Sequence, residues 1–202
     1  VSNKLLRVGS IDPETIVRDR LAYVFGVTLE KHYLAGTGTN QPLGVFTASA
    51  NGISASRDVS ADNTASAITA DGLINAKFAL KGQYWPRARW IFHRDAVKQI
   101  RKLKDGNNNY LMGPLAQAGE PMILDIPYIT SEFAPNTFAA NQYVGILGDF
   151  SFYWYTDALD MTVQRLVELY AETNQVGFIG RYEGDGMPVL EEAFVRVQLA
   201  AV

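Results

Sequence analysis

Three glycines follow a helix-like run in the stretch YLAGTGTNQPLGVF, residues 33–46. They surround a proline, and the four residues are Gly36, Gly38, Pro42 and Gly44. A glycine-rich loop can cradle a phosphate, but a Walker loop needs a Lys-Ser/Thr pair after its last glycine, and a dinucleotide loop needs a helix after it. Here Val45 and Phe46 follow instead, and the helix comes first, so its negative end faces the glycines. The pattern therefore predicts a sharp backbone turn that binds no phosphate.

Other residues with catalytic potential are few. The chain has two histidines, His32 and His93, no cysteine and no G-x-S-x-G nucleophile motif. Neither histidine has a second histidine or a carboxylate at the spacing of a known metal site, and Asp95 beside His93 is better explained as a helix cap. The acids of EGDG, 183–186, could pair for acid–base chemistry, but a charged turn explains them better. We expect no catalytic residue, no cofactor and no metal.

Charge is distributed unevenly along a chain whose net charge is −3, which argues against a general nucleic-acid or membrane-surface binder. Between positions 87 and 104 there are seven basic residues and one acid, Asp95, whereas between 149 and 192 there are nine acids and two arginines. The basic residues are Arg87, Arg89, Arg94, Lys98, Arg101, Lys102 and Lys104. The two segments are either two solvated faces or complementary surfaces that meet between copies of the chain.

A long helix over residues 12–34 must position the glycine loop. Asp12 is a suitable N-cap, Pro13 fits the first helical position, and Gly36 is a plausible stop. Apolar residues recur at helical spacing and predict one buried stripe: Ile16, Val17, Leu21, Val24, Phe25 and Leu29. We expect this stripe to pack on strands from residues 150–187, because no apolar run close in sequence can cover it.

The rest of the chain alternates irregularly between helical and extended patterns, which predicts the α+β class. We expect a surface excursion over 47–70, a helix over 71–82 capped by Asp71, a buried strand over 88–93 and a helix over 95–104. Residues 106–121 predict a loop, and short strands dominate from 122 onward. No apolar run approaches the length of a membrane span.

The order of these motifs resembles the major capsid proteins of tailed bacteriophages, which share the Hong Kong 97-like fold. The resemblance begins in residues 3–46, where an acid-capped long helix leads into G-x-G-x-x-x-P-x-G-hydrophobic, matched by Gly36, Gly38, Pro42, Gly44 and Val45. It continues through 69–114, MILDIPYITSEFAP at 122–135, YVGILGDFSFYWYTD at 143–157 and GMPVLEEAFVRVQLA at 186–200. One departure is Asp125-Ile126, where the family commonly has a glycine.

The resemblance implies a structural protein, not an enzyme, with a long spine helix and mixed sheets. Its peripheral domain would comprise residues 1–35 and 150–187, and its axial domain 36–149 and 188–202. The glycine loop would be the hinge between the two domains. The loop after the short helix would line the capsomer axis through Asn107, Asn108, Asn109, Tyr110, Leu111 and Met112.

The resemblance also implies self-assembly into hexamers and pentamers of an icosahedral head around double-stranded DNA, which is held by non-specific contact. Portal, scaffolding region and maturation protease would be the other partners. Subunits would be made in the bacterial cytoplasm and end in the virion, with no membrane partner. Relatives carry an N-terminal arm and an extended hairpin before the spine helix, so we expect this chain to be a trimmed core. The alternatives are an encapsulin-type compartment shell and a ligand-binding or enzymatic domain that uses Trp85, Trp90 or Trp154 as a platform.

Overall fold

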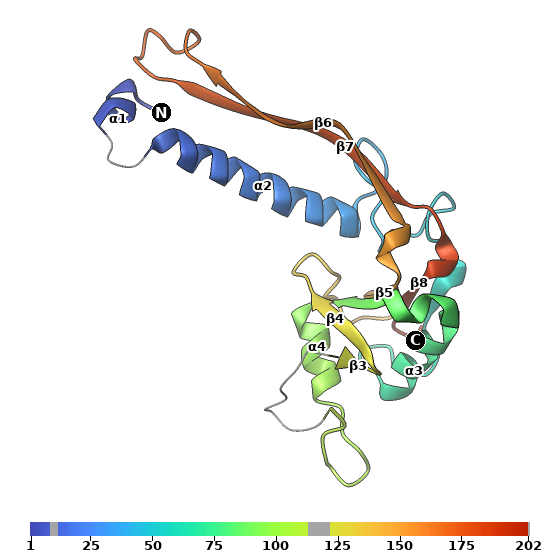
Figure 1. Cartoon of the computed structure of the whole chain (residues 1–202). Coiled ribbons are helices and arrows are strands. Elements are labelled where there is room, and N and C mark those ends of the chain that lie inside the picture. Colours follow the sequence, from blue (N-terminus) through green and yellow to red (C-terminus); the bar gives the residue numbers. More distant parts are fainter. Residues whose placement is uncertain (9–11, 113–121, 202) are drawn as a thin grey trace.

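The computed structural model describes residues 1–8, 12–112 and 122–201. Figure 1 shows two parts, an elongated arm and a compact body. The arm consists of helices α1 (Asn3–Val8) and α2 (Pro13–Ala35) and the long strands β6 (Tyr153–Leu166) and β7 (Gly177–Pro188). The body contains the remaining strands with helices α3 (Ala70–Ala79) and α4 (Arg94–Arg101). The expected α+β class is confirmed.

The body is built on a six-stranded mixed sheet in the order β1-β8-β5-β2-β4-β3. The strands are β1 (Asp58–Val59), β2 (Arg89–Phe92), β3 (Met122–Ile123), β4 (Ile126–Thr130), β5 (Tyr143–Gly148) and β8 (Phe194–Gln198). The pairs β1–β8 and β2–β4 are parallel, and the other neighbours are antiparallel. The expected strand over 88–93 is β2, and it lies in the interior of the sheet.

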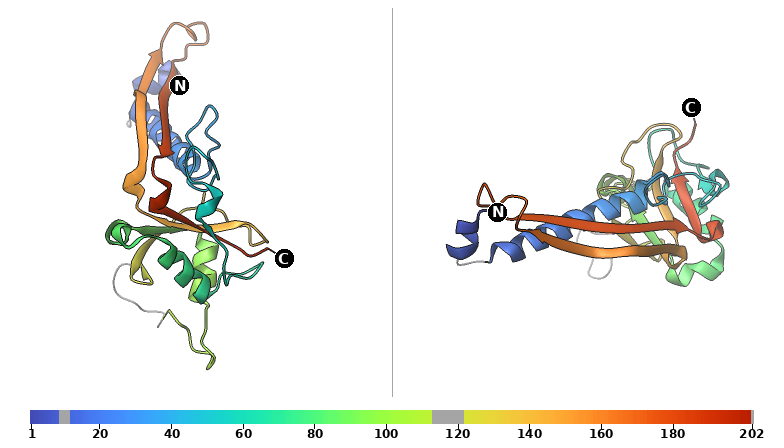
Figure 2. Two further views of the ribbon diagram at one scale, coloured as in Figure 1. Left: turned by 90° about the vertical axis from the view of Figure 1, so that its right-hand side faces the viewer. Right: turned by 90° about the horizontal axis from the view of Figure 1, so that it is seen from above.

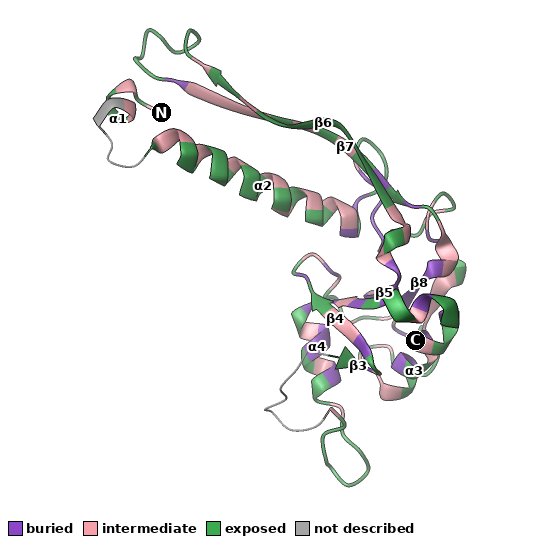
Figure 3. Cartoon of the chain, in the orientation of Figure 1, coloured by how far each residue is buried: buried purple, intermediate pink, exposed green. Residues whose placement is uncertain are grey.

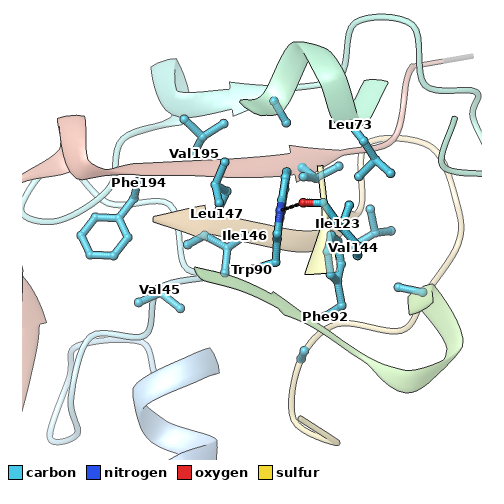
Figure 4. Close-up of a cluster of buried hydrophobic side chains, with 14 of the residues drawn as sticks. Val45, Leu73, Trp90, Phe92, Ile123, Val144, Ile146, Leu147, Phe194 and Val195 are labelled. Atoms are coloured by element: carbon cyan, nitrogen blue, oxygen red, sulfur yellow. Dashed lines mark hydrogen bonds between the residues drawn. The ribbon is translucent and has the colours of Figure 1, made fainter. Parts of the chain in front are cut away.

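The hydrophobic core of the chain lies on this sheet (Figure 4). Trp90 and Phe92 are fully buried and stack on each other, and the Trp90 Nε1 donates to the Ile123 carbonyl at 3.1 Å. Two short 3₁₀ helices lie within the body, Ala55–Arg57 and Gly82–Arg87, and two more lie where the chain passes between body and arm, Phe150–Phe152 and Glu191–Ala193. The C-terminal strand β8 supplies much of the core, which ties the last part of the chain to the middle part.

A buried ion pair fixes the 47–70 excursion to the sheet. Arg196 on β8 is fully buried, and its Nε donates to Asp58 Oδ1 at 2.6 Å. The Tyr143 hydroxyl donates to the other Asp58 oxygen at 2.8 Å. Burial, followed by this bond to Asp58, raises the pKa of Tyr143. The excursion therefore has a buried anchor that its low-periodicity sequence did not reveal.

The long helix α2 begins and ends as predicted. The Asp12 side chain accepts from the Glu14 amide, Pro13 is the first helical residue, and the Gly36 amide caps the helix by donating to the His32 carbonyl. The prediction that the apolar stripe of α2 is buried is wrong, because none of its six residues is fully buried. Leu34, which lies outside that stripe, is the buried residue of this helix. Ile16 and Val24 are more than half exposed, whereas Phe25 is half-buried. Figure 3 shows α2 as a mixture of exposed and intermediate residues. The reason is that a two-stranded hairpin covers only one side of a helix.

The arm's second layer is the antiparallel hairpin of β6 and β7, which runs along α2 (Figure 2). Phe25 contacts the Tyr182 ring on β7, so the predicted packing of α2 on residues 150–187 is confirmed. The prediction of a charged turn at EGDG is wrong, because residues 183–186 lie inside β7 and pair with β6. Two register shifts in β6 mark bulges along the hairpin.

Two predicted helix caps are also wrong. The N-cap of α3 is Thr69, whose hydroxyl accepts from the Gly72 amide, and Asp71 lies within the first turn. The N-cap of α4 is His93, whose Nδ1 accepts from the Asp95 amide at 3.2 Å. In both cases the N-cap is the residue with extended backbone angles just before the helix, whereas the predicted aspartate already lies in the first helical turn. Across the described ranges, no helix is long and apolar enough to cross a membrane.

Candidate functional site

The glycine loop directly follows α2 and is hydrogen-bonded to the end of that helix. The Val45 amide donates to the Tyr33 carbonyl at 3.1 Å, and the Phe46 amide donates to the Leu34 carbonyl at 2.9 Å. The Gly44 amide donates to the Gly36 carbonyl at 2.9 Å. These amides satisfy backbone carbonyls in and just after the last turn of α2. They are therefore occupied by the chain itself and do not form a cradle for a phosphate.

Close backbone contact explains two of the glycines. A Cβ on Gly36 would lie 2.1 Å from the Pro42 carbonyl oxygen, and a Cβ on Gly44 would lie 2.5 Å from the Gly36 nitrogen. Gly36 itself has φ −66°, an angle open to any residue. Gly38 is different, because its φ of +78° lies in the left-handed region. The loop is thus a fixed corner whose small residues allow the chain to fold back on the helix end.

Contacts to the hairpin hold this corner in place. The Leu43 amide donates to the Gly186 carbonyl on β7 at 2.8 Å, and the Tyr153 hydroxyl on β6 donates to the Leu43 carbonyl at 3.0 Å. Val45 and Phe46 then enter the core of the body, both buried. The loop therefore joins α2, the hairpin and the body at a single point.

A cleft of about 500 Å³ separates α2 from the body beside this corner. Its lining is mainly apolar and includes Leu29, Tyr33, Ile129 and Tyr155. The Ser131 hydroxyl donates across it to Glu30 Oε1 at 2.5 Å. This seam between arm and body offers one carboxylate already bonded to a hydroxyl, which is not an arrangement for acid–base chemistry.

The predicted capsomer-axis loop projects from the end of the body opposite the arm (Figure 1). Asp105 organises it, since its carboxylate accepts from the amides of Asn107 at 2.9 Å and Asn109 at 2.8 Å. The bonds from Asn109 are the main reason why the pKa of Asp105 lies below its ordinary value. Asn108 has φ 66°, as expected for an asparagine in a tight turn. Sequence reasoning named the asparagines and missed Asp105, although Asp before Gly-Asn is a turn signal.

Two large side chains of this loop are exposed, Tyr110 at 57% and Leu111 at 53%. Lys104 Nζ lies 4.9 Å from the centre of the Tyr110 ring and donates to Asn108 Oδ1 at 2.8 Å. Met112 is half-buried against the core. Residues 113–121, which include the rest of the predicted loop, lie outside the described residues. The described part is an ordered turn that presents apolar surface to solvent.

The histidines have structural surroundings. His93 is buried, with Nδ1 3.2 Å from Asp95 Oδ2 and Nε2 3.3 Å from Glu132 Oε2. His32 lies in the last turn of α2. In the part of the chain that the structure describes, no group of three His, Cys, Asp or Glu side chains could hold a metal ion.

The tryptophans do not form a common platform. Trp90 is in the core, and Trp85 is half-buried with its Nε1 donating to the Leu80 carbonyl at 3.0 Å. Trp154 is 65% exposed, on β6 of the hairpin. Of the three tryptophans named for the ligand-binding alternative, Trp154 is the exposed one, and Trp90 is excluded as a platform by its burial.

Exposed apolar side chains are concentrated on the arm, a feature that sequence reasoning missed. They include Ile16, Tyr23, Val24, Trp154, Tyr155, Met161, Val167, Leu169, Tyr170 and Met187. These side chains lie on both layers of the arm, on α2 and on the hairpin. Recognising residues 183–186 as strand would have predicted that alternate side chains of β7 face solvent, Met187 among them. The arm therefore has apolar side chains that this chain alone does not cover.

Several solved structures share this fold. The chain aligns with the capsid of a native GTA particle at a TM-score of 0.84 and 25% identity, over 100% of this chain and 70% of that one. It aligns with Microbacterium phage Oxtober96 at a TM-score of 0.70 and 17% identity, over 98% and 69%. The encapsulin complex of Synechococcus elongatus PCC 7942 aligns at a TM-score of 0.67 and 13% identity, over 98% and 70%. The last two likenesses concern the fold alone.

Residues 1–199 match the phage capsid family, and the chain belongs to that family. It is a structural capsid protein with the Hong Kong 97-like fold, not an enzyme, and its place is the capsid of a phage or GTA-type particle. No curated protein sequence matches the chain. The resemblance seen in its motifs is confirmed.

Proposed function

We propose that this chain is the core of a major capsid subunit that forms hexamers and pentamers of an icosahedral head around double-stranded DNA. The observation that carries the proposal is the family match over nearly the whole chain, together with the likeness to a GTA capsid computed with C5 symmetry. The exposed apolar side chains of the arm support it, because large exposed apolar patches mark protein–protein interaction sites.

In this proposal the arm and the body correspond to the two domains of the subunit. The peripheral domain comprises 1–35 and 150–187, with α2 as the spine helix, and the axial domain comprises 36–149 and 188–202. The corner formed by Gly36, Gly38, Pro42 and Gly44 joins them. The loop from Asn107 to Met112 faces the symmetry axis, where copies of Tyr110 and Leu111 cover one another. Its position at the end of the body opposite the arm supports this arrangement.

The proposed head has further partners in the complete system: a portal, a scaffolding region and a maturation protease. The packaged double-stranded DNA makes only non-specific contacts. This expectation is consistent with a net charge of −3, which gives the chain no general attraction for phosphates.

Electron microscopy of the full-length gene product tests the function. We expect closed shells or capsomer rings, with nuclease-protected double-stranded DNA in particles from producing cells. Particles that hold a protein cargo and no nucleic acid would instead favour the encapsulin-type compartment. A gene product that stays monomeric at every concentration in sedimentation velocity would overturn the assignment.

A further inference from the structure

The outward face of the hairpin carries apolar and acidic side chains together. Along β7, the even-numbered positions face α2, since a Cβ on Gly180 would meet Phe25 and Tyr182 contacts the same ring. The odd-numbered positions therefore face away from α2, and they include Glu183, Asp185 and Met187. Trp154 lies directly across from Met187 in the register. We call Trp154, Glu183, Asp185 and Met187 the hairpin face.

The acids of the hairpin face lack a cation of their own chain. Among the described residues, neither Glu183 nor Asp185 takes part in an ion pair. Arg181, the next outward position, directs Nη1 to Gln164 Oε1 at 2.8 Å. Asp185 accepts only the neighbouring Gly186 amide at 2.8 Å. The face thus presents two carboxylates beside an exposed aromatic ring.

A second unpartnered face lies on α2. Helical spacing puts on it Ile16, Arg20, Tyr23, Val24, Val27 and Lys31, which we call the helix face. Ile16, Tyr23 and Val24 are each more than half exposed, and the Arg20 guanidinium lies 5.3 Å from the Tyr23 ring centre. Over the described ranges, Arg20 and Lys31 have no ion pair either. Asp19 lies at the border of this face, one turn before Tyr23.

The two faces cannot meet within one chain. The arm has two layers, α2 and the hairpin (Figure 1), and the Phe25–Tyr182 ring contact and the Glu14–Arg165 ion pair lie between them. The helix face turns away from the hairpin, and the hairpin face turns away from α2. One is apolar and basic, and the other is apolar and acidic.

We propose that the hairpin face of one subunit docks on the helix face of the next subunit, with Glu183 and Asp185 facing the part of α2 between Arg20 and Lys31. This contact is heterologous, because each copy uses two different surfaces, as a ring of subunits requires. Charge complementarity selects a second copy as the occupant and sets the register of docking. The inference rests on the proposed shell function and names the surfaces that such a shell would use.

The helix face is too small to hold two subunits together by itself, so it would be one of several contacts between them. A helix of 23 residues is about 34 Å long and roughly 10 Å wide, so its free face covers on the order of 350 Å². A stable isolated interface needs about 800 Å² per partner. The docking is therefore weak for a single pair and gains strength when a ring closes and other contacts form together.

Charge exchange in the full-length gene product tests the docking. The variant E183K/D185K and the variant R20E/K31E should each reduce the assembled fraction by about tenfold or more, because like charges then face each other across the contact. The four substitutions combined in one chain should restore assembly to near the wild-type level. Assembly is measured by sedimentation velocity and electron microscopy, and circular dichroism checks that each variant is folded.

A matched control separates this contact from net charge. The variant E183K/D185K/K98E/K102E has the same net charge as the fourfold exchange. Its two lysine-to-glutamate substitutions lie on α4 and just after it, away from the helix face, so assembly should stay defective. Normal assembly of E183K/D185K, or equal rescue by the control, would overturn the docking while leaving the shell function intact. Failure of the wild-type product to assemble would overturn the shell function itself.

Discussion

At the residue scale, Gly44 and Gly26 differ in what surrounds them. A Cβ on Gly44 would lie within 2.6 Å of backbone atoms at the end of α2, whereas a Cβ on Gly26 would meet nothing within 4 Å. We expect Gly44→Ala to lower the free energy of unfolding by about 1–3 kcal/mol, since backbone atoms must shift to admit the methyl group. Urea unfolding of the purified chain measures this change.

Gly26→Ala is the matched control for that experiment. Gly26 lies inside α2, where alanine is the better helix former by about 1 kcal/mol. The substitution should leave stability unchanged or raise it slightly. If both alanine variants unfold at the same urea concentration as the wild type, close packing at Gly44 is not the reason for its glycine.

Tyr153 makes the stability of the corner sensitive to alkaline pH. Its pKa is raised well above the ordinary value, chiefly by burial and next by the proximity of Tyr33. A tyrosine with a raised folded-state pKa contributes stability that is complete below its unfolded pKa of about 10 and is lost as pH rises toward the folded value. We therefore expect stability to fall above about pH 10. Tyr153→Phe should weaken that pH dependence while costing about 1 kcal/mol at neutral pH through the lost bond to Leu43.

Ultraviolet absorbance at 295 nm follows this titration directly. The native wild-type chain and the native Tyr153→Phe chain should show equal numbers of tyrosines ionising in the ordinary range, because Tyr153 does not ionise there. After unfolding in urea, the wild-type chain should show one more ionising tyrosine than the variant. Identical titration curves for native and urea-unfolded wild-type protein would contradict the raised pKa of Tyr153.

At the element scale, α2 has one covered side and one open side. Phe25 is half-buried against Gly180 and Tyr182, so Phe25→Ala should destabilise the chain by about 1–3 kcal/mol, less than the 3–5 kcal/mol typical of a full core position. Tyr23→Ala, on the open side, should change stability by less than about 0.5 kcal/mol. Thermal unfolding of the two variants compares the sides of one helix.

In an assembly assay, Tyr23→Ala should have the larger effect, although Phe25→Ala has the larger effect on stability. Tyr23 lies on the helix face, so its loss should reduce assembly although the isolated chain is unaffected. Equal thermal shifts for Phe25→Ala and Tyr23→Ala would mean that the hairpin does not cover the helix as described.

At the scale of the whole molecule, the chain is a body with a buried hydrophobic core and an arm with many exposed apolar side chains. Tyr110→Asp combined with Leu111→Asp should leave the fold intact, since both side chains are more than half exposed. In the proposed ring, however, each copy would place two unpaired carboxylates in a buried contact, at a cost of several kcal/mol per subunit. We expect folded subunits that fail to form capsomers, as judged by sedimentation velocity and electron microscopy.

Gln83→Asp, at an exposed position of the body outside this loop, is the control for added charge. Its side chain is not among the apolar groups that would face neighbouring copies, so capsomers should still form. Normal shells from the Tyr110→Asp, Leu111→Asp chain would refute the placement of this loop at the symmetry axis.

Local signals in the sequence were sufficient for the elements whose determinants lie close together. Asp12, Pro13 and Gly36 mark the ends of α2 because capping and backbone geometry act over a few residues. The apolar run around Trp90 predicted a buried strand, and the missing Lys-Ser/Thr pair after Gly44 excluded a phosphate loop. The order of such motifs along the chain was also enough to identify the capsid family and its fold.

Tertiary structure decided the features that depend on what lies opposite a residue. Periodicity located the apolar side of α2, but its depth of burial depends on the width of a hairpin more than a hundred residues away. EGDG has the composition of a turn and is held as strand by its pairing with β6. Asp58 and Arg196 are 138 positions apart, and only the sheet brings them together. Burial, charge pairing and exposed docking faces are properties of the surroundings, and distant segments supply those surroundings only once the chain has folded.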